Sequence, residues 1–244
     1  GLAFGALPQD ILHAIRAPIV ALVHHPLALE TGLSSQAAQA FIASERLALS
    51  FAQYVIVTSP TTREIVLRDY GVAADRVRVA VPGTKRAARA RGSGGAGLHL
   101  LAVGSVVPRK AYDLLLDALA SCADLDWTLT IAGSLARAPD YAQQLVARAP
   151  QCVHFTGEVS DAELAALYAQ ADLFVMASHY EGYGMVLGEA MARGLPIVCT
   201  DGGALAETVP QEAAWHVRAG DLGALTQALR GMMTDDVLRQ KMAE

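Results

Sequence analysis

The sequence predicts an α/β protein of two units, each built around a parallel β-sheet. Apolar runs of strand length alternate with runs of helix length from one end of the chain to the other, which is typical of βαβ units. Residues 85–97 interrupt this alternation with Arg, Ala, Gly and Ser, and such a composition is typical of linkers. The alternation then starts again at Leu98. We therefore expect a first domain at 1–84, a linker at 85–97 and a second domain at 98–244.

The first domain shows few strands. Its apolar runs predict strands at 18–23, 54–58 and 76–81 and helices at 36–52 and 61–70. Pro82 and Gly83 end the last of these strands. The strands follow the same pattern as the rest of the chain but are too few for a nucleotide-binding domain of their own.

The second domain shows a complete doubly wound pattern. Ser160 and Glu163 have the spacing of a capping box at the start of its third helix. Gly194 and Pro196 are expected to end the helix that follows Met185. Strands are predicted at 98–104, 127–132, 153–155, 172–176 and 196–200, and helices at about 111–122, 141–149 and 161–170, after Met185 and from Asp221 onward.

Composition limits the classes of function. The chain has 244 residues, of which 53% are hydrophobic and 18% are charged, so it can bury a large core. Its net charge of −5 gives no reason to expect a polyanion-binding surface, and we predict no nucleic acid partner. Cys122, Cys152 and Cys199 show no CxxC spacing, which favours a reducing compartment. No apolar run is long enough to span a bilayer, so we expect a soluble, cytoplasmic protein.

Two carboxylates, Glu181 and Glu189, flank a glycine-broken turn. Residues 171–178 before it have the composition of a buried strand, and the residues after Met185 have that of a helix. The turn is therefore expected at the carboxyl edge of the sheet, where open α/β sheets bind ligands. A carboxylate accepts hydrogen bonds from sugar hydroxyls, and glycines let backbone amides approach a phosphate. Glutamates near a helix start also stabilise its dipole, but two of them around a Gly-Tyr-Gly turn favour one polyol-binding pocket that both face.

The loop from Gly104 to Lys110 is a second candidate, because it follows a predicted strand and precedes a predicted helix. It lacks the second glycine and the hydroxyl residue of a P-loop, so a triphosphate cradle with magnesium is not expected. Arg109 and Lys110 would nevertheless lie at the carboxyl edge, where a diphosphate needs cations. The alternative is a solvated loop that binds no ligand.

Two other patterns do not predict a site. Gly182 and Gly184 do not start a dinucleotide fingerprint, because Leu187 stands where the third glycine is needed. Asp124 and Asp126 resemble a metal-binding pair, but they follow a helix and precede a strand, on the edge of the sheet away from ligands. We therefore predict no metal site.

His24 and His25 end the first predicted strand, again at a carboxyl edge. A histidine there is either structural or part of a site, and a metal would need further ligands. The residues alone leave both alternatives open.

The segment from Glu181 to Glu189, with Glu-Gly-Tyr-Gly at its start and Glu-Ala-Met-Ala at its end, resembles the signature of the retaining glycosyltransferases of family four. These enzymes have the GT-B fold of two Rossmann-like domains. The resemblance therefore implies a GT-B fold with two parallel sheets, the first domain being incomplete. It extends over nearly the whole chain, at 55–59, 81–83, 103–104, 108–110, 131–134, 155–160, 167–168, 171–172 and 194–198.

The resemblance implies a role for each matching residue. Glu189 would bind the ribose hydroxyls of a nucleotide-sugar donor, and Glu181 the hydroxyls of the donor sugar. Lys110 and Arg109 would neutralise the diphosphate leaving group, and His24 would lie near the donor sugar. The catalytic residues would then be Glu181, His24 and Lys110, with no metal and no cofactor. The backbone close to the donor would come from Gly104, Gly182, Tyr183, Gly184 and Met185.

The implied activity is the transfer of a hexose from a nucleotide-diphosphate sugar, of the UDP or GDP type, to a hydroxyl acceptor with retention of configuration. The acceptor would be a glycan or a lipid-linked hydroxyl, as in carbohydrate biosynthesis, and peripheral membrane contact is left open. One alternative is a nucleotide-sugar-binding module that is inactive for transfer. Another is a sugar-nucleotide epimerase of similar architecture, which the spacing of the two glutamates disfavours.

The chain departs from the family pattern at several points. Ser105 stands where an arginine is usual, so Arg109 is expected to carry more of the phosphate contact, and Ala111 stands where a glycine is usual. A glycine-rich loop before Gly1 and a helix crossing back to the first domain near Glu244 would both be usual. We therefore expect a truncated chain and leave open whether it transfers sugar alone.

Overall fold

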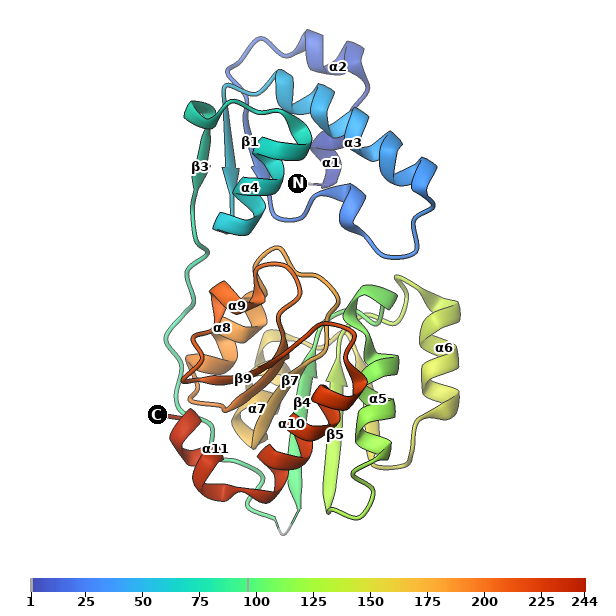
Figure 1. The fold of residues 1–244 in the computed structure, drawn as a ribbon, viewed down its shortest axis with the longest axis vertical. Helices are drawn as coiled ribbons and strands as arrows, with labels where there is room; N and C mark the ends of the chain where they lie inside the picture. Colours follow the sequence, from blue (N-terminus) through green and yellow to red (C-terminus); the bar gives the residue numbers. More distant parts are fainter. Residues whose placement is uncertain (1, 96) are drawn as a thin grey trace. The chain divides into compact units, whose positions relative to one another are not determined.

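A computed structural model of the chain describes residues 2–95 and 97–244 (Figure 1). Tertiary contacts divide it into two compact units. Unit 1 is Gly1–Gly83 with Glu181–Tyr183, and unit 2 is Thr84–Tyr180 with Gly184–Glu244. Unit 1 contains a three-stranded sheet and unit 2 a six-stranded sheet. All strand pairs in both sheets are parallel, so the predicted α/β fold with two parallel sheets is confirmed.

Unit 1 has the strand order β1-β2-β3, and its predicted strands and helices are all present. The short helices α1, α2, η1 and η2 have no counterpart in the prediction, because they are too short to show a helical period. The elements are α1 (Leu2–Gly5), α2 (Gln9–Ala14), β1 (Val20–Val23), η1 (Leu27–Leu29), α3 (Ser35–Ser50), β2 (Tyr54–Val57), α4 (Pro60–Tyr70), η2 (Ala74–Arg76) and β3 (Val77–Val79).

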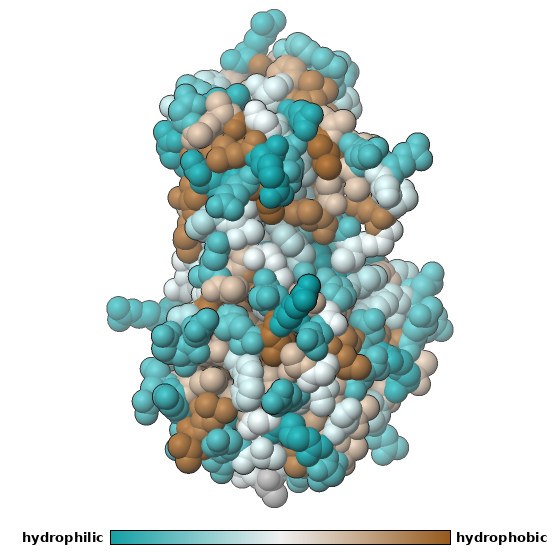
Figure 2. Space-filling view, in the orientation of Figure 1, coloured by the Kyte–Doolittle hydropathy of each residue, from teal (hydrophilic) through white to brown (hydrophobic). Residues whose placement is uncertain are grey.

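The core of unit 1 lies on one face of its sheet. Val55 and Val57 of β2 are fully buried there, in a cluster to which α3 and α4 contribute. The other face carries exposed apolar side chains: Val20 is 53% exposed, Leu22 41% and Tyr54 41%. Figure 2 shows apolar residues among the polar ones on the visible surface of this unit. The apolar character of this second face is typical of parallel sheets, which are normally covered on both faces.

Unit 2 has the strand order β6-β5-β4-β7-β8-β9. The five predicted strands are present near their predicted bounds, and β9 is an addition. Its four residues include Trp215 and His216 in the middle and show neither an apolar run nor a clear alternation. The strands are β4 (Leu98–Val103), β5 (Trp127–Ala132), β6 (Val153–Gly157), β7 (Leu173–Met176), β8 (Ile197–Thr200) and β9 (Ala214–Val217).

Helices cover both faces of this sheet (Figure 1). The strands supply alternate residues to two cores, Leu100 and Ala102 to one and Leu101 to the other. The result is a doubly wound sheet. One face carries α5 (Tyr112–Ala120), α6 (Pro139–Arg148) and α10 (Leu222–Thr234), and the other carries α7 (Asp161–Gln170), α8 (Met185–Met191) and α9 (Leu205–Thr208).

Local hydrogen bonds set the helix boundaries in unit 2. Ser160 and Glu163 form the predicted capping box at the start of α7. After α8, the amide of Leu195 donates to the carbonyl oxygen of Ala190, and Gly194 takes a φ of +63°. This arrangement is a Schellman motif, which needs a left-handed residue that glycine supplies most easily. The predicted helix end at Gly194 is therefore confirmed.

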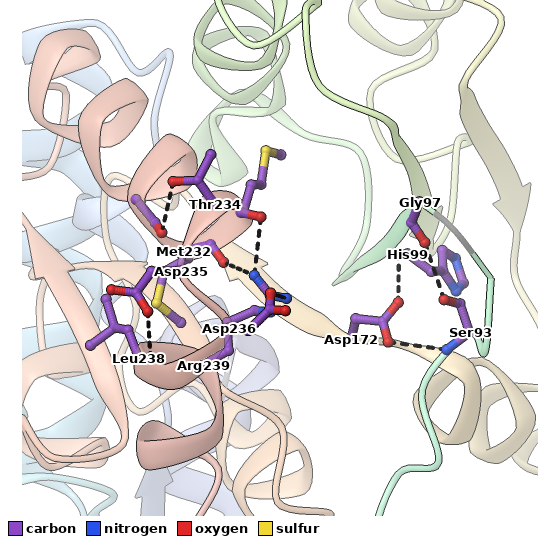
Figure 3. Close-up of polar contacts among 12 residues, drawn as sticks. Ser93, Gly97, His99, Asp172, Met232, Thr234, Asp235, Asp236, Leu238 and Arg239 are labelled. Atoms are coloured by element: carbon purple, nitrogen blue, oxygen red, sulfur yellow. Dashed lines mark hydrogen bonds and ion pairs between the residues drawn. The ribbon is translucent and has the colours of Figure 1, made fainter.

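The last predicted helix is divided in two. Asp235 ends α10, and its carboxylate accepts a hydrogen bond from the amide of Leu238 at the start of α11 (Asp236–Met242). Arg239 donates to the carbonyl oxygens of Met232 at 2.6 Å and Met233 at 3.0 Å (Figure 3). Hydrogen bonds on both sides therefore stabilise the break between the two helices. The continuous helical pattern in the sequence does not predict it.

Residues 89–93, here named the strap, run along unit 2 and are bonded to it. The amide of Ala90 donates to the carbonyl oxygen of Arg193 at 2.8 Å, and the amide of Arg91 donates to that of Ala169 at 2.8 Å. These bonds make the strap an ordered part of unit 2. The predicted domain boundaries at 84 and 98 stay predictions.

Asp172, just before β7, bonds the strap to the start of β4. Its carboxylate accepts from the amide of Ser93 at 3.1 Å and from the amide of His99 at 2.8 Å (Figure 3). Gly92 lies so close to this carboxylate that a Cβ at residue 92 would be 2.5 Å from Oδ1 of Asp172. One side chain therefore organises backbone groups on both sides of residues 94–98.

Ala111 has a backbone conformation that glycine adopts at little cost. It has φ +50° and ψ +42°, it is fully buried, and it directly precedes α5. Among the residues that the structure describes, it is the only one other than glycine with positive φ. The left-handed region costs an L-residue about 1–2 kcal/mol. The methyl group at the position where the family usually has glycine is accommodated, with strain.

Replacing Asp172 with alanine should destabilise unit 2 by about 1–3 kcal/mol, because two backbone amides lose their acceptor. Urea-induced unfolding followed by tryptophan fluorescence measures this, since Trp127 and Trp215 both belong to unit 2. Asp117→Ala is the matched control, because Asp117 lies in an exposed ion pair with Arg148, and such pairs contribute at most about 1 kcal/mol. Equal unfolding transitions for the two variants would contradict this role of Asp172.

Ala111→Gly should change the free energy of unfolding by less than about 1 kcal/mol in either direction. Relief of about 1–2 kcal/mol of backbone strain is offset by about 0.8 kcal/mol of lost methyl burial and about 0.4–1 kcal/mol from the freer unfolded chain. Ala111→Val should destabilise by more than about 2 kcal/mol, because a branched side chain is forced into a filled site at positive φ. The same fluorescence measurement distinguishes the variants, and similar losses in both would disprove the strained conformation.

Candidate functional site

The candidate site in unit 2 lies at the carboxyl edge of the sheet, at the end of β4 and β7. In the strand order, β4 has β5 on one side and β7 on the other. The chain after β4 enters α5 on one face of the sheet, and the chain after β7 enters α8 on the opposite face. Such a switch point is where doubly wound sheets bind ligands, because the loops leave in opposite directions.

Lys110 lies over the backbone at the end of β4. A Cβ on Gly104, whose φ is +150°, would be 2.8 Å from Cε and 3.1 Å from Nζ of Lys110. The carbonyl oxygen of Gly104 accepts from the Tyr112 hydroxyl at 3.0 Å, and its amide donates to Ala132 at 2.8 Å. Gly104 therefore permits the close approach of the ammonium group, and its neighbours fix the backbone beneath it.

Gly133, at the end of β5, lies in close backbone contact with Gly104. A Cβ on Gly133, whose φ is +157°, would be 2.1 Å from the carbonyl oxygen of Gly104. The ends of β4 and β5 are thus packed backbone against backbone. The loop that carries Lys110 is anchored to the sheet by contacts that tolerate no side chain at residue 133.

Arg109 joins the loop after β4 to the loop after β7. Its Nη1 donates to the carbonyl oxygen of Tyr180 at 2.7 Å, and its own carbonyl oxygen accepts from the amide of His179 at 2.8 Å. The guanidinium group is therefore committed in part to the protein backbone. The predicted phosphate contact of Arg109 stays a prediction.

Glu189 lies on α8 and is half-buried. Its Oε2 accepts a hydrogen bond from the Tyr168 hydroxyl at 3.0 Å, and its carbonyl oxygen accepts from Nη1 of Arg193 at 2.9 Å. The Arg193 guanidinium also lies 4.4 Å from the centre of the Tyr168 ring. Burial, and then the neighbouring Glu189 carboxylate, raise the pKa of the Tyr168 phenol above its usual value. Tyr168 therefore stays a protonated donor at neutral pH.

No sequence pattern links Tyr168 with Glu189. The tyrosine lies on α7, on the other side of β7 in the chain, and it reaches Glu189 only because α7 and α8 cover the same face of the sheet. The one available signal is the Leu167-Tyr168 match within the resemblance, which carries no role by itself. Tyr168 is a residue of the site that only the fold identifies.

The other carboxylate of the motif belongs to unit 1 by its contacts. Glu181–Tyr183 group with that unit, and Glu181 is only 9% exposed. Within unit 1, the carbonyl oxygen of Gly182 accepts from the hydroxyls of Thr58 at 3.2 Å and Thr62 at 3.3 Å. A Cβ on Gly182 would lie 1.8 Å from the carbonyl oxygen of His24, which also belongs to unit 1, so glycine is needed there. A common pocket for Glu181 and Glu189 stays a prediction.

The remaining predicted residues divide between the units. His24 directly follows β1 in unit 1 and is exposed, and Tyr183 lies in the same unit. Gly184, with a φ of +85°, and Met185 open α8 in unit 2. Unit 2 therefore holds six members of the predicted set on the segments that follow β4 and β7: Gly104, Arg109, Lys110, Gly184, Met185 and Glu189.

The two aspartates that resemble a metal-binding pair in the sequence make structural contacts. Asp124 forms an ion pair with Arg230 at 2.6 Å, and the carbonyl oxygen of Asp126 accepts from the amide of Leu98 at 3.0 Å. Within residues 2–95 and 97–244, no group of three or more His, Cys, Asp or Glu side chains has the arrangement of a metal site. None of the helices in these ranges has the length and apolar character needed to cross a membrane.

Two family models match the chain. Residues 97–235 match the family described as glycosyl transferases group 1, and residues 2–86 match the family described as glycosyltransferase family 4. The first match covers most of unit 2, and the second covers most of unit 1.

Curated relatives are similar to the chain over much of its length. It is 31% identical over 230 residues to an MMP α-(1→4)-mannosyltransferase of Mycolicibacterium hassiacum, which covers 87% of this chain and 56% of the relative. It is 32% identical over 174 residues to the mannosylfructose-phosphate synthase of Agrobacterium fabrum, which covers 62% of this chain and 38% of the relative. The chain thus spans about half the length of the curated relatives it matches.

Solved structures share the fold. A sucrose-phosphate synthase of Thermosynechococcus elongatus superposes with a TM-score of 0.83 and 25% identity, over 98% of this chain and 64% of that one. The Anabaena protein HepE, solved with UDP and glucose, gives a TM-score of 0.80 and 23% identity over 94% of this chain and 65% of that one. Matches to both units and a relative similar over 87% of the sequence lead to one conclusion: this chain belongs to the family 4, or group 1, glycosyltransferases and has their GT-B fold.

Proposed function

We propose that this chain carries the donor-binding part of an enzyme that transfers a hexose from a nucleotide-diphosphate sugar to a hydroxyl acceptor, with retention of configuration. The observation that carries the proposal is the set of groups around the switch point of unit 2. Lys110 and Arg109 follow β4, Glu189 follows β7, and the two loops are joined by hydrogen bonds through Arg109. Two cations and a carboxylate match the diphosphate and the ribose of such a donor.

Each residue has a distinct task in the proposed reaction. Glu189 accepts hydrogen bonds from the ribose hydroxyls and fixes the nucleoside. Lys110, with Arg109, stabilises the negative charge that develops on the diphosphate as the bond from the anomeric carbon to the phosphate oxygen breaks. Glu181 binds donor-sugar hydroxyls, and His24 lies near the donor sugar. A fixed cation is effective here because it needs no reorganisation when the charge appears.

Retention follows from departure and attack on one face of the sugar. The diphosphate leaves, the acceptor oxygen bonds to the anomeric carbon from the same side, and the acceptor proton passes to the departing phosphate oxygen. No carboxylate of unit 2 is assigned as a nucleophile. The basic residues supply the charge that a metal would otherwise provide, so the proposed reaction needs no metal.

The names of the relatives support the donor class. Two of them are named for mannosyl transfer or mannosylfructose-phosphate synthesis, and the Anabaena structure contains UDP and glucose. A donor of the UDP or GDP type is therefore proposed, with a glycan or lipid-linked hydroxyl as acceptor.

A second candidate function is nucleotide-sugar binding without transfer by this chain alone. The observation that favours it is the coverage, since the chain spans 56% of one curated relative and 38% of another. Acceptor contacts in the relatives can lie in the part that is not matched. Binding with no turnover would distinguish this candidate from the first.

Glu189→Ala should weaken binding of UDP or GDP about ten- to a hundredfold, because hydrogen bonds to a charged group contribute about 1.5–3 kcal/mol. Lys110→Ala should also weaken binding, and the loss should be larger at low salt, where charges are less screened. Calorimetric titration of both nucleotides measures these effects.

The matched controls for this titration are Glu212→Ala and Lys241→Ala. Glu212 is exposed before β9, and Lys241 is exposed on α11, both far along the chain from the site loops. The controls should bind as the unchanged chain does. Normal binding by the Glu189 and Lys110 variants would show that the site is wrongly assigned, and no binding of either nucleotide by the unchanged chain would exclude both candidate functions.

Transfer should preserve the anomeric configuration of the donor. With UDP-glucose or GDP-mannose, which are α-configured, the glycoside or the first hydrolysis product should be α. Proton NMR of the anomeric signal, recorded before mutarotation, measures this. A β-configured initial product would contradict same-face departure and attack.

A further inference from the structure

We propose that Tyr168 is a positioning residue that orients Glu189 through its hydroxyl, so that the carboxylate presents Oε1 to the nucleoside of the donor. This inference rests on the proposed function, because it assumes that Glu189 binds the nucleoside. It assigns to a residue on α7 a part in donor binding that no motif in the sequence indicates.

Two neighbouring side chains hold the ring of Tyr168. It is fully buried, and it is stacked with Phe174 at 5.8 Å between ring centres with an interplanar angle of 17°. The Arg193 guanidinium lies 4.4 Å from the centre of the same ring. A ring fixed in this way directs its hydroxyl at one place, since a phenol moves only with its ring.

The hydroxyl has two acceptors within reach. Oε2 of Glu189 is 3.0 Å away, and the carbonyl oxygen of Val186 is 3.2 Å away. A hydroxyl has one proton to donate, and a carboxylate is the stronger acceptor because it is charged. Tyr168 therefore donates to Glu189 and engages Oε2, which leaves Oε1 for the ligand.

The side chain of Arg193 is bonded to the backbone of the same glutamate. Its Nη1 donates to the carbonyl oxygen of Glu189 at 2.9 Å while the guanidinium covers the Tyr168 ring. The side chain and the main chain of Glu189 are thus fixed by two residues that also contact each other. A glutamate fixed before the ligand arrives loses less conformational freedom on binding, and affinity increases accordingly.

The second acceptor makes the proposal testable. When Glu189 is replaced by alanine, the Tyr168 hydroxyl can donate to the Val186 carbonyl oxygen and is not left as an unpaired buried group. The Glu189→Ala variant should therefore fold, and effects of Tyr168 can be measured in both backgrounds.

The experiment is a double-mutant cycle in the full chain, with affinity for UDP or GDP, whichever binds more tightly, as the readout. Tyr168→Phe removes the hydroxyl and keeps the ring and its contacts with Phe174 and Arg193. In the unchanged background it should weaken binding about three- to tenfold, the effect of one hydrogen bond. In the Glu189→Ala background it should have no further effect, because the group that it positions is absent.

Tyr141→Phe is the matched control. The Tyr141 hydroxyl also donates to a carboxylate, Oδ1 of Asp113 at 2.8 Å, but between α6 and α5. Its removal should leave nucleotide affinity unchanged. Thermal unfolding of every variant shows whether a change in affinity accompanies a change in stability.

The outcomes separate the two proposals. A loss of affinity from Tyr168→Phe that is equal in both backgrounds would show a structural role and overturn the positioning role. Normal binding by Tyr168→Phe, with weak binding by Glu189→Ala, would also overturn it and leave the proposed function intact. Normal binding by Glu189→Ala, or no nucleotide binding by the unchanged chain, would overturn the proposed function and the positioning role with it.

Discussion

The placement of β4 between β5 and β7 is the constraint on which the site depends. Parallel strands are joined by right-handed crossovers, so the chain adds β5 and β6 on one side of β4 before α7 returns it to the other side. The helices α5 and α8 must then leave the two central strands toward opposite faces. The loops that precede them are therefore neighbours at the carboxyl edge, and residues as far apart in sequence as Arg109 and Tyr180 become hydrogen-bonded.

Most of the fold could be predicted because its strands are buried. A strand covered on both faces needs a continuous apolar run, and Leu173–Met176 and Ile197–Thr200 show such runs. The break at Asp235 could not be predicted, because its stabilising bonds connect Arg239 to the end of the preceding helix. Composition alone also could not show that the strap is ordered, because the acceptor of the Ser93 amide is the distant Asp172.

The candidate site also has residues that the sequence indicates and one that only the fold reveals. Lys110, Arg109 and Glu189 could be proposed as site residues, because they follow buried strands at the edge of the sheet where doubly wound folds bind ligands. Tyr168 could not, because its contact with Glu189 depends on the packing of α7 beside α8. The sequence shows that Ala111 stands where a glycine is usual. It does not show that its φ is positive, so the strain could not be predicted. Local patterns thus indicate candidate groups for ligand binding, and tertiary packing determines which side chains contact those groups.

The strap has a practical consequence for anyone who isolates unit 2 as a recombinant fragment. A fragment that starts at Leu98, where the apolar pattern resumes, would omit the backbone donors at Ala90, Arg91 and Ser93. The carbonyl oxygens of Ala169 and Arg193 and the carboxylate of Asp172 would then face water. Proteases would also gain access to the amino ends of β4 and β7. A fragment that starts near Thr84 keeps the strap and should resist proteolytic digestion better.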